Sequence, residues 1–469
     1  MSDDQTIFAP ASAAGKAGVA VFRISGKEAR RVITDLCIPH ALPAPRFAAL
    51  RDIKHPKSGE VIDRALVLFF PAPHSFTGED VVEFHTHGGR AITNAVIDAL
   101  SALPHFRLAE AGEFTRRAFE NGKMDLTEAE AIADLIHAET EAQRKQALRQ
   151  LDGALGRIYE DWRARLSRSL AYMEAAIDFS DEELPPDMLE KQSAVLCALR
   201  EEIAAHLNDN HRGERLREGF SIAILGAPNA GKSSLLNALA RREAAIVSPT
   251  AGTTRDVIEV HLDIAGYAVT LADTAGLRDS SDAIENEGIR RAHVHAQRAD
   301  LKLLVFDGTL EPDAETLALI DADALIIVNK ADKIQNPPSH ATAGIPLPLR
   351  EGLGAGLVGL VSHSKFGSCV LPVLISAHTG EGIDTLLQKL AQEIDRRFTD
   401  KGTPPLTRAR HRSALEECVA HIDRALQAPM ADLRAEDVRL AMRSLGRITG
   451  RVDVEDLLDI IFRDFCIGK

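Results

Sequence analysis

The segment Gly226–Ser233, with the sequence GAPNAGKS, has the spacing that a phosphate-binding loop requires. It follows a predicted strand at 221–225 and precedes a predicted helix that starts at Ser234. In that context the backbone N–H groups of a glycine-rich loop can surround a β-phosphate. Lys232 can then reach the β- and γ-phosphates, and the hydroxyl of Ser233 can ligate Mg²⁺. The sequence therefore predicts a nucleotide triphosphate site at the end of this strand.

An acidic turn follows the third strand that we predict in the same region. The run Asp273-Thr274-Ala275-Gly276 provides a carboxylate that can hold the Mg²⁺ shell and a glycine N–H that can sense the γ-phosphate. The next residue is Leu277, where Ras-type GTPases carry a glutamine that orients the attacking water. A leucine cannot orient or polarise water, so hydrolysis must be slow or must use another group. Four downstream acids are candidates, although most of them read as solvated charges: Asp279, Asp282, Glu285 and Glu287.

Two further motifs point to the base of the nucleotide. The run Asn329-Lys330-Ala331-Asp332 follows a buried-type strand at 324–328. The carboxylate of Asp332 can accept hydrogen bonds from N1–H and N2–H₂ of guanine, and adenine lacks these donors. The pair Ser376-Ala377 follows the last predicted strand and suits a loop that supports guanine O6. Four motifs in this order and spacing predict GTP as the nucleotide.

The stretch 246–256, with the sequence IVSPTAGTTRD, stands where the first switch segment of a GTPase belongs. We expect Thr254 to ligate Mg²⁺ in the GTP state. The many hydroxyls and carbonyls near Asn229 also suit an oxygen-coordinated monovalent cation. Such an ion can supply the positive charge that an arginine finger supplies elsewhere.

Short apolar strands alternate with helical patterns from Phe220 onward, which predicts a doubly wound sheet. Helix-rich sequence brackets this region, from 125 to 179 with a further helix at 188–207, and again after Gly382. The economical interpretation is an α/β domain inserted into a helical domain. The strands predicted for the inserted domain are 221–225, 257–264, 268–272, 301–306, 324–328 and 372–375.

The N-terminal region has a mixed α/β pattern, with strands predicted at 19–24, 65–70 and 81–87 and a helix at 90–103. At the start of the long helical stretch, Thr127 and Glu130 have the spacing of a capping box, and Gly153 and Gly156 are expected to bend the helix. The stretch 334–370, rich in proline and glycine, reads as a loop or insertion. The expected domains are 1–123, 124–215, 216–386 and 387–469.

Composition narrows the class of protein. The 469 residues carry a formal net charge of −14, which disfavours a general DNA-coating protein but not a structured RNA partner. Aromatic residues make up 4%, so a base-stacking platform is not expected. The five cysteines are widely spaced without a CxxC pair, which fits a reducing compartment. With no secretory signal and no apolar run of spanning length, we expect a cytoplasmic protein without a membrane partner.

Three runs and the domain order resemble the MnmE (TrmE) family, bacterial tRNA-modification GTPases with a mitochondrial counterpart. The runs are AFENGKMDL at 118–126, GTTRD at 252–256 and FCIGK at 465–469, and the resemblance extends over essentially the whole chain. It implies an N-terminal tetrahydrofolate-binding α/β domain, followed by a central helical domain that a Ras-like G domain interrupts. The N-terminal domain of the family dimerises the protein. The folate contacts of the family correspond here to Arg23, Glu83, Lys123 and Lys469, for 5,10-methylene- or 5-formyl-tetrahydrofolate.

The resemblance also implies a mechanism for the G domain. In the family, G domains pair through their switch segments around K⁺, and the K⁺ contacts correspond to Asn229, Ser248, Thr250 and Thr253. The water-activating carboxylate corresponds to Glu285, while Mg²⁺ would bind Ser233 and Thr254. The full set expected around GTP is Asn229, Ala230, Gly231, Lys232, Ser233, Ser234, Ser248, Thr250, Thr253, Thr254, Asp273, Thr274, Ala275, Gly276, Asn329, Lys330, Asp332, Ser376 and Ala377.

The partners implied by the resemblance are a second copy of the chain, tRNA and the FAD-dependent protein MnmG (GidA), in a heterotetramer-type complex. Together the two proteins add an aminomethyl or carboxymethylaminomethyl group to C5 of the wobble uridine, with a folate as one-carbon donor. Three features depart from the family pattern: Ser248 replaces a common threonine, HTHGG stands at 85–89, and the glycine-rich loop at 345–361 is long. A direct catalytic role of Cys466 stays open.

Other interpretations of the same residues compete with this one. The chain can be a ribosome-assembly switch with slow hydrolysis as a timer, or a folate-dependent transferase whose G domain is only regulatory. Glu83 lies in an apolar strand and needs a cationic or N–H-rich partner, and His85 and His87 share a strand face that could bind a metal. The basic residues of the helical stretch are interpreted as a solvated face, with a tRNA contact as the less favoured alternative: Arg144, Lys145, Arg149, Arg157, Arg163, Arg165 and Arg168.

Overall fold

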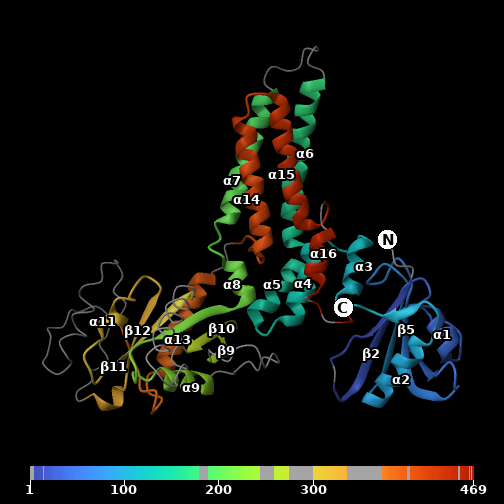
Figure 1. Cartoon of the computed structure of the whole chain (residues 1–469), viewed down its shortest axis with the longest axis horizontal. Coiled ribbons are helices and arrows are strands. Elements are labelled where there is room, and N and C mark those ends of the chain that lie inside the picture. The colour runs from blue at the N-terminus through green and yellow to red at the C-terminus, as the bar shows by residue number, and fades with distance from the viewer. Residues whose placement is uncertain are drawn as a thin grey trace, which may run out of the picture. The chain divides into compact units, whose positions relative to one another are not determined.

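The computed structural model describes residues 5–13, 15–178, 188–242, 258–273, 299–334, 372–398, 402–452, 455–463, 465 and 467–468 (Figure 1). Contacts between residues divide the chain into two compact units. Unit 1 comprises Met1–Ile136, Ala147–Ala204 and Arg410–Lys469, and unit 2 comprises His137–Gln146 and Ala205–Ala409. Within the described residues, no helix is both long enough and apolar enough to cross a bilayer.

Unit 2 is built on a six-stranded sheet with the order β13-β12-β11-β8-β10-β9. Neighbouring strands run parallel except β9 and β10, which form a hairpin. All six strands predicted for this region are confirmed, with bounds that differ by one or two residues. The strands are β8 (Phe220–Leu225), β9 (Ile258–Ile264), β10 (Tyr267–Asp273), β11 (Leu301–Asp307), β12 (Ala324–Asn329) and β13 (Val373–Leu374).

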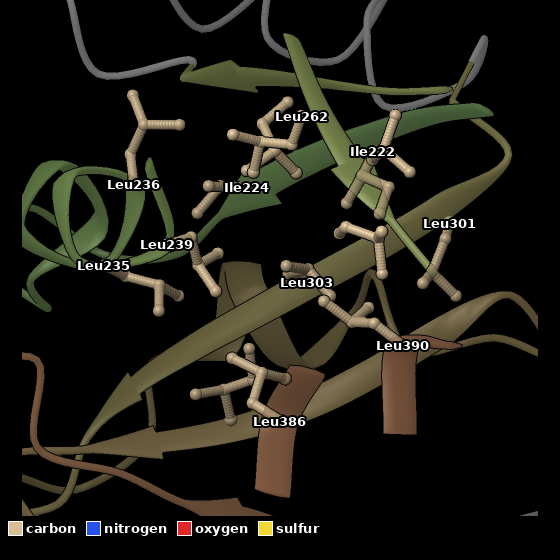
Figure 2. Packing of buried hydrophobic residues seen from close by; sticks show 14 of the residues in the cluster. Ile222, Ile224, Leu235, Leu236, Leu239, Leu262, Leu301, Leu303, Leu386 and Leu390 are labelled. Atoms are coloured by element: carbon tan, nitrogen blue, oxygen red, sulfur yellow. The ribbon is translucent and has the colours of Figure 1, made fainter. Parts of the chain in front are cut away.

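Apolar side chains cover both faces of this sheet, as expected for a doubly wound fold. On one face, Ile222 and Ile224 of β8 pack with helices α9 (Lys232–Arg242) and α13 (Ile383–Phe398), and Figure 2 shows part of this core. On the other face, Leu304 and Phe306 of β11 pack near α11 (Ala314–Leu317). The domain boundary expected at 386 falls inside α13, whose buried residues belong to the core of unit 2. The expected insertion at 334–370 lies outside the described residues apart from Ile334.

The N-terminal part of unit 1 is a seven-stranded sheet with the order β3-β4-β5-β6-β2-β1-β7. The predictions of β2, β5, β6 and helix α2 are confirmed. Strands β1, β3, β4 and β7 were not predicted: β1 runs into a proline, β3 and β7 have only two and three residues, and half of the residues of β4 are polar. The elements are β1 (Thr6–Pro10), β2 (Ala17–Ser25), α1 (Arg31–Leu36), β3 (Cys37–Ile38), β4 (Ala49–Lys54), β5 (Val61–Phe70), β6 (Val81–Gly88), α2 (Arg90–Ser101), β7 (Phe106–Leu108) and α3 (Glu113–Glu120).

Helices α1 and α2 cover one face of this sheet, and the strand alternation decides what faces the other side. Phe22 of β2 and Phe84 of β6 point into the core under the helices. Because successive side chains of a strand point to opposite faces, Arg23 and Glu83 belong to the face without α1 and α2. The backbone pairing places Arg23 directly opposite Glu83 on the neighbouring strand.

Four long helices of unit 1 form a bundle: α6 (Ala154–Asp178), α7 (Met188–Leu207), α14 (Ala409–Gln427) and α15 (Ala431–Thr449). An ion pair marks each contact around the ring. Arg165 of α6 meets Glu202 of α7, and Arg200 of α7 meets Asp423 of α14. The ring closes with the pairs Arg424–Asp437 between α14 and α15, and Arg439–Glu174 between α15 and α6.

The helix-rich stretch predicted from 125 to 179 is helical but is divided by two breaks. It forms α4 (Leu126–His137), α5 (Glu141–Leu151) and α6. Gly153 causes the second break, since its φ of +75° is a left-handed conformation that an α-helix does not contain. Gly156, expected to bend the helix, lies within α6 close to the carboxylate of Asp125.

The predicted capping box of Thr127 and Glu130 is wrong, because Asp125 takes the capping position. Its Oδ1 accepts a hydrogen bond from the backbone N–H of Glu128 at 2.9 Å, and Glu128 Oε2 accepts one from the N–H of Asp125 at 2.8 Å. The hydroxyl of Thr127 donates to the same aspartate. An aspartate is a strong N-cap, so the box forms two residues earlier than expected.

Glu130 instead joins α4 to α14 in the interior of unit 1. Arg410 Nε lies 2.6 Å from Glu130 Oε1, and His411 Nε2 lies 3.0 Å from Glu130 Oε2. The side chains of Glu130 and His411 are 4% and 0% exposed. Burial alone would raise the pKa of Glu130, but the charges and hydrogen bonds of Arg410 and His411 outweigh burial and hold that pKa well below its usual value.

Replacing Glu130 with glutamine should destabilise unit 1, because Arg410 would keep a buried charge without its counter-charge. We expect a loss of about 3 kcal/mol in the free energy of unfolding. Trp162, the single tryptophan of the chain, lies in α6 and reports on unit 1 by fluorescence during denaturation. Glu417→Gln, which removes an exposed partner of Arg447, is the matched control and should change stability by less than about 0.5 kcal/mol.

The same pair of variants has a defined pH dependence. A carboxyl group with a lowered folded-state pKa stabilises the fold above its unfolded pKa of about 4.3, and this contribution is lost as pH falls toward the folded-state pKa. The stability difference between the native chain and Glu130→Gln should therefore stay constant near neutral pH and shrink below about pH 4. A difference that grows on acidification would contradict this assignment.

Candidate nucleotide and folate sites

The predicted phosphate-binding loop connects β8, an interior strand of the sheet in unit 2, to helix α9. Its backbone turns through left-handed conformations at Asn229 and Gly231, with φ of +65° and +97°. A Cβ at Gly226 would overlap the carbonyl oxygen of Val305 on β11, so this position has room only for glycine. The predicted residues Asn229, Ala230, Gly231, Lys232, Ser233 and Ser234 thus lie together where the strand ends and the helix begins.

The ammonium of Lys232 lies against its own loop. Its Nζ donates to the carbonyl oxygens of Gly226 and Ala227 at 2.7 and 2.9 Å. The residue is 9% exposed, so this cation is held at the loop rather than extended into solvent. A preorganised loop of backbone N–H groups with one lysine is the donor set that a polyphosphate requires, and the hydroxyl of Ser233 in the first turn of α9 fits Mg²⁺.

Asn329 connects the phosphate-binding loop to the loop after β13. Its Nδ2 donates to the carbonyl oxygen of Ala230 at 2.9 Å, and its Oδ1 accepts from the N–H of Ala377 at 3.0 Å. The side chain is buried, with 2% exposure. A Cβ at Gly231 would overlap the same amide nitrogen. Asn329 therefore fixes the two loops relative to each other.

The structure also brings Asp332 to the loop after β13. A hydrogen bond from the hydroxyl of Ser376 lowers the pKa of Asp332, an exposed carboxyl group that is ionised at neutral pH. An ionised carboxylate can only accept hydrogen bonds, which suits the N–H groups at the edge of guanine. The predicted base-recognition residues Asn329, Lys330, Asp332, Ser376 and Ala377 thus come together at the ends of β12 and β13.

Several predicted residues of this site lie outside what the structure describes. Asp273 ends β10, and only its backbone is described. The assignments of the remaining Mg²⁺, K⁺ and water-activating positions stay predictions. Outside the described residues lie Ser248, Thr250, Thr253, Thr254, Thr274, Ala275, Gly276, Glu285, Cys466 and Lys469.

One residue near this site was not predicted. Asp307 ends β11, and its Oδ2 lies 2.5 Å from Nζ of Lys330. The only sequence signal is an acidic residue directly after an apolar strand, and many surface turns have that pattern.

The candidate folate residues Arg23 and Glu83 form an ion pair in unit 1. Arg23 Nε lies 3.1 Å from Glu83 Oε1, with side-chain exposures of 15% and 17%. The guanidinium carbon lies 5.2 Å from the ring centroid of Phe76 and 5.9 Å from that of Phe114. Arg23 is therefore the cationic partner that the position of Glu83 in an apolar strand requires, and the pair keeps a residual accessible surface.

Lys123 and the end of the chain approach the same domain. Lys123 Nζ donates to the carbonyl oxygen of Pro73 at 3.0 Å, in the loop that carries Phe76. Ile467 forms a β-bridge with Ala111, and Gly468 lies so close to the carbonyl oxygen of Pro10 that a Cβ would overlap it. Ile467 and Gly468 of the C-terminal motif thus lie against the N-terminal domain, near the end of β1, the strand beside β2.

The histidines and the basic helix residues have protein partners. His85 Nε2 lies 3.4 Å from Glu83 Oε2, and His87 Nδ1 lies 2.8 Å from Asp63 Oδ1. Among the residues described, no group of three or more His, Cys, Asp or Glu side chains is arranged to hold a metal ion. Arg144 and Lys145 both pair with Glu141, as expected for a solvated helix face.

The sheet order of unit 2 and the loops at the carboxyl ends of its strands define a P-loop module with the motifs of a GTPase. Two family models cover nearly the whole chain: "GTP-binding protein TrmE N-terminus" matches residues 6–123, and "MnmE helical domain" matches residues 126–466.

Curated relatives match over their full length as well. The chain is 54% identical over 469 residues to "tRNA modification GTPase MnmE" of Parvibaculum lavamentivorans, covering 99% of this chain and 100% of the relative. It is 53% identical to the protein of the same name from Paramagnetospirillum magneticum, again covering 99% and 100%. The human "5-taurinomethyluridine-[tRNA] synthase subunit GTPB3, mitochondrial" is 46% identical, covering 99% and 93%. The chain therefore belongs to the MnmE (TrmE) family of tRNA modification GTPases.

Replacing Gly231 with alanine should weaken nucleotide binding, because the new Cβ would push the Asn329 amide out of its bridge between the two loops. Strain of about 1–3 kcal/mol corresponds to a loss of affinity of about fivefold or more. Titration of the full chain with a fluorescent GDP analogue measures this. Gly402→Ala is the control, because Gly402 has a similar φ of +80° but no atom within 4 Å of the place that a Cβ would take. An equal effect of both substitutions would show that backbone strain alone is responsible.

Proposed function

We propose that this protein is the GTP-hydrolysing component of a complex that modifies C5 of the wobble uridine in certain tRNAs. With an FAD-dependent partner of the MnmG (GidA) type, it would add an aminomethyl or carboxymethylaminomethyl group. The observation that carries the proposal is the 54% identity to a tRNA modification GTPase over 99% of this chain and 100% of the relative. The human relative is named as a subunit of a 5-taurinomethyluridine-[tRNA] synthase, which supports action within a multi-protein complex.

The arrangement of unit 2 supports hydrolysis of GTP by a route that does not use the usual glutamine. Lys232 and the loop N–H groups would hold the phosphates, while Asp332 would select guanine. Leu277 cannot orient water, and Glu285, which corresponds to the water-activating carboxylate of the family, would take that role. Mg²⁺ on Ser233 and Thr254, and K⁺ on Asn229, Ser248, Thr250 and Thr253, would offset the negative charge that develops on the phosphates.

The arrangement of unit 1 supports a folate site on the sheet face that α1 and α2 leave open. The pterin ring of a folate carries an amino group and a ring N–H, and a carboxylate such as Glu83 can accept both. Lys123 and Lys469 would contribute positive charge toward the carboxylates of the folate tail, while Arg23 would position Glu83. The donor would be 5,10-methylene- or 5-formyl-tetrahydrofolate.

The same sheet face supports a homodimer. Leu50 of β4 and Leu66 of β5 lie directly opposite each other and are 57% and 42% exposed. Both belong to the strand face that also carries Glu83. Neighbouring exposed leucines on a sheet are unusual on a monomer surface, and a second copy of this domain would cover them.

Deleting the gene should abolish the modification at the wobble uridine, because no other step in the proposed scheme supplies the one-carbon unit there. Nucleoside mass analysis of bulk tRNA from the deletion strain would measure this. Complementation with the native gene should restore the modified nucleoside, whereas Glu285→Ala should not. A normal nucleoside profile in the deletion strain would overturn the proposed function and favour a role outside tRNA modification.

Replacing Glu83 with glutamine should weaken binding of 5-formyl-tetrahydrofolate by about tenfold or more, because a neutral amide replaces a charge-assisted acceptor. Calorimetric titration of the full chain would measure the affinity. Asp52→Asn is the matched control, since Asp52 pairs with Arg64 on the same sheet in an exposed position. It should change the affinity by less than about twofold. Equal losses for both variants would place the folate elsewhere.

A further inference from the structure

We infer that Asp307 is a positioning residue for guanine nucleotide binding, which acts by fixing the side chain of Lys330. The inference rests on the proposed GTP binding by unit 2. Asp307 ends β11, and Lys330 follows Asn329 at the end of the neighbouring strand β12. The two strands are in parallel register with Asp307 opposite Asn329, which brings the aspartate beside the base-recognition loop.

Asp307 is a largely buried carboxylate whose two oxygens both have hydrogen-bond partners. Its Oδ2 lies 2.5 Å from Nζ of Lys330. Its Oδ1 accepts hydrogen bonds from both the N–H and the hydroxyl of Thr309, at 2.9 and 2.6 Å. The side chain of Asp307 is 9% exposed, and that of Lys330 is 28% exposed. Both carboxylate oxygens therefore have partners. The hydrogen bonds from Thr309 hold the carboxylate in the orientation that contacts Lys330.

The backbone of Lys330 is fixed as well. Its φ of +64° is a left-handed conformation that residues other than glycine adopt only with support from their surroundings. That support is visible on both sides: the N–H of Gly308 donates to the carbonyl oxygen of Asn329 at 2.9 Å, and the N–H of Ala331 donates to that of Ile375 at 3.0 Å. The lysine is thus held at its backbone by β11 and β13 and at its ammonium by Asp307.

A lysine held at both ends presents its aliphatic stem in one place before any ligand arrives. A free lysine side chain loses considerable rotamer freedom when a ligand orders it, and that loss subtracts from the affinity. With Asp307 in place, the ordering is completed during folding. The aliphatic stem of Lys330, which lies between Asn329 and Asp332 in the sequence, can then pack against the face of a planar base. Asp307 itself needs no contact with the nucleotide for this effect.

The alternative interpretation is that Asp307 and Lys330 form an ion pair with a structural role only. A second ion pair on β11 can be compared with it. Lys302, the second residue of β11, lies 2.5 Å from Asp321, but Asp321 is 43% exposed and the pair is at the other end of the strand. An exposed pair of this kind contributes little to stability and nothing to the site. Asp321→Asn is therefore the matched control for Asp307→Asn.

The experiment measures the affinity of the full chain for a fluorescent GDP analogue in a double-mutant cycle. Asp307→Asn should weaken binding by about tenfold, the effect of losing one charge-assisted contact, and Asp321→Asn by less than about twofold. In a Lys330→Met background, Asp307→Asn should weaken binding by less than about a further twofold, because the ammonium that Asp307 holds is absent. A purely structural role of Asp307 would give the same loss in both backgrounds.

The outcomes distinguish failure of the nucleotide site from failure of the role of Asp307. If the native chain binds no guanine nucleotide, the proposed function of unit 2 fails. If the native chain binds GDP and Asp307→Asn binds it equally well, or loses the same factor in both backgrounds, the inference about Asp307 is overturned. Should Asp307→Asn not fold, Asp307→Glu takes its place: the longer carboxylate keeps the charge but shifts it, and the loss must again vanish in the Lys330→Met background.

Discussion

The nucleotide site depends on the two hydrogen bonds of the Asn329 side chain. One buried amide donates to the loop after β8 and accepts from the loop after β13. Without it, the carbonyl of Ala230 and the N–H of Ala377 would lose their partner, and unpaired polar groups of this kind cost about 1–3 kcal/mol each when buried. The amide also explains the glycine at 231, where any side chain would displace it. Phosphate and base recognition are thus coupled through one residue.

The sequence is most informative where local pattern and topology agree. Apolar strands that alternate with helices predict a parallel sheet, and the carboxyl ends of parallel strands meet at one edge. This is why Asn329, Asp332 and Ser376 can be placed at one site from the sequence alone. Asp307 was not predicted as a site residue, because its role depends on which strand lies beside β12. A single acidic residue after a strand does not indicate the neighbouring strand.

Unit 1 shows where local reasoning fails. Thr127 was predicted to cap α4, but Asp125, two residues earlier, caps it instead and also accepts the hydroxyl of Thr127. Glu130 then becomes available for a tertiary role, with partners 280 and 281 residues away in the sequence. Arg23 and Glu83 were expected as separate ligand contacts. The register of β2 and β6 places them opposite each other, where they form an ion pair in the absence of a ligand. A folate at this position must therefore bind an ion pair, not two independent charges.

Helix α5 contributes residues to both units. Its first turns belong to unit 2: the N–H of Ala142 donates to the carbonyl oxygen of Gly266, and Gln143 Nε2 donates to that of Arg217. Gly266 lies in the turn between β9 and β10, strands that lie between the two expected switch segments in the sequence. The last turns of α5 belong to unit 1, where Gln150 Nε2 donates to the carbonyl oxygen of Thr127. Within unit 2, α5 is therefore bonded to the turn of the hairpin between the expected switch segments, and within unit 1 the same helix is bonded to the start of α4.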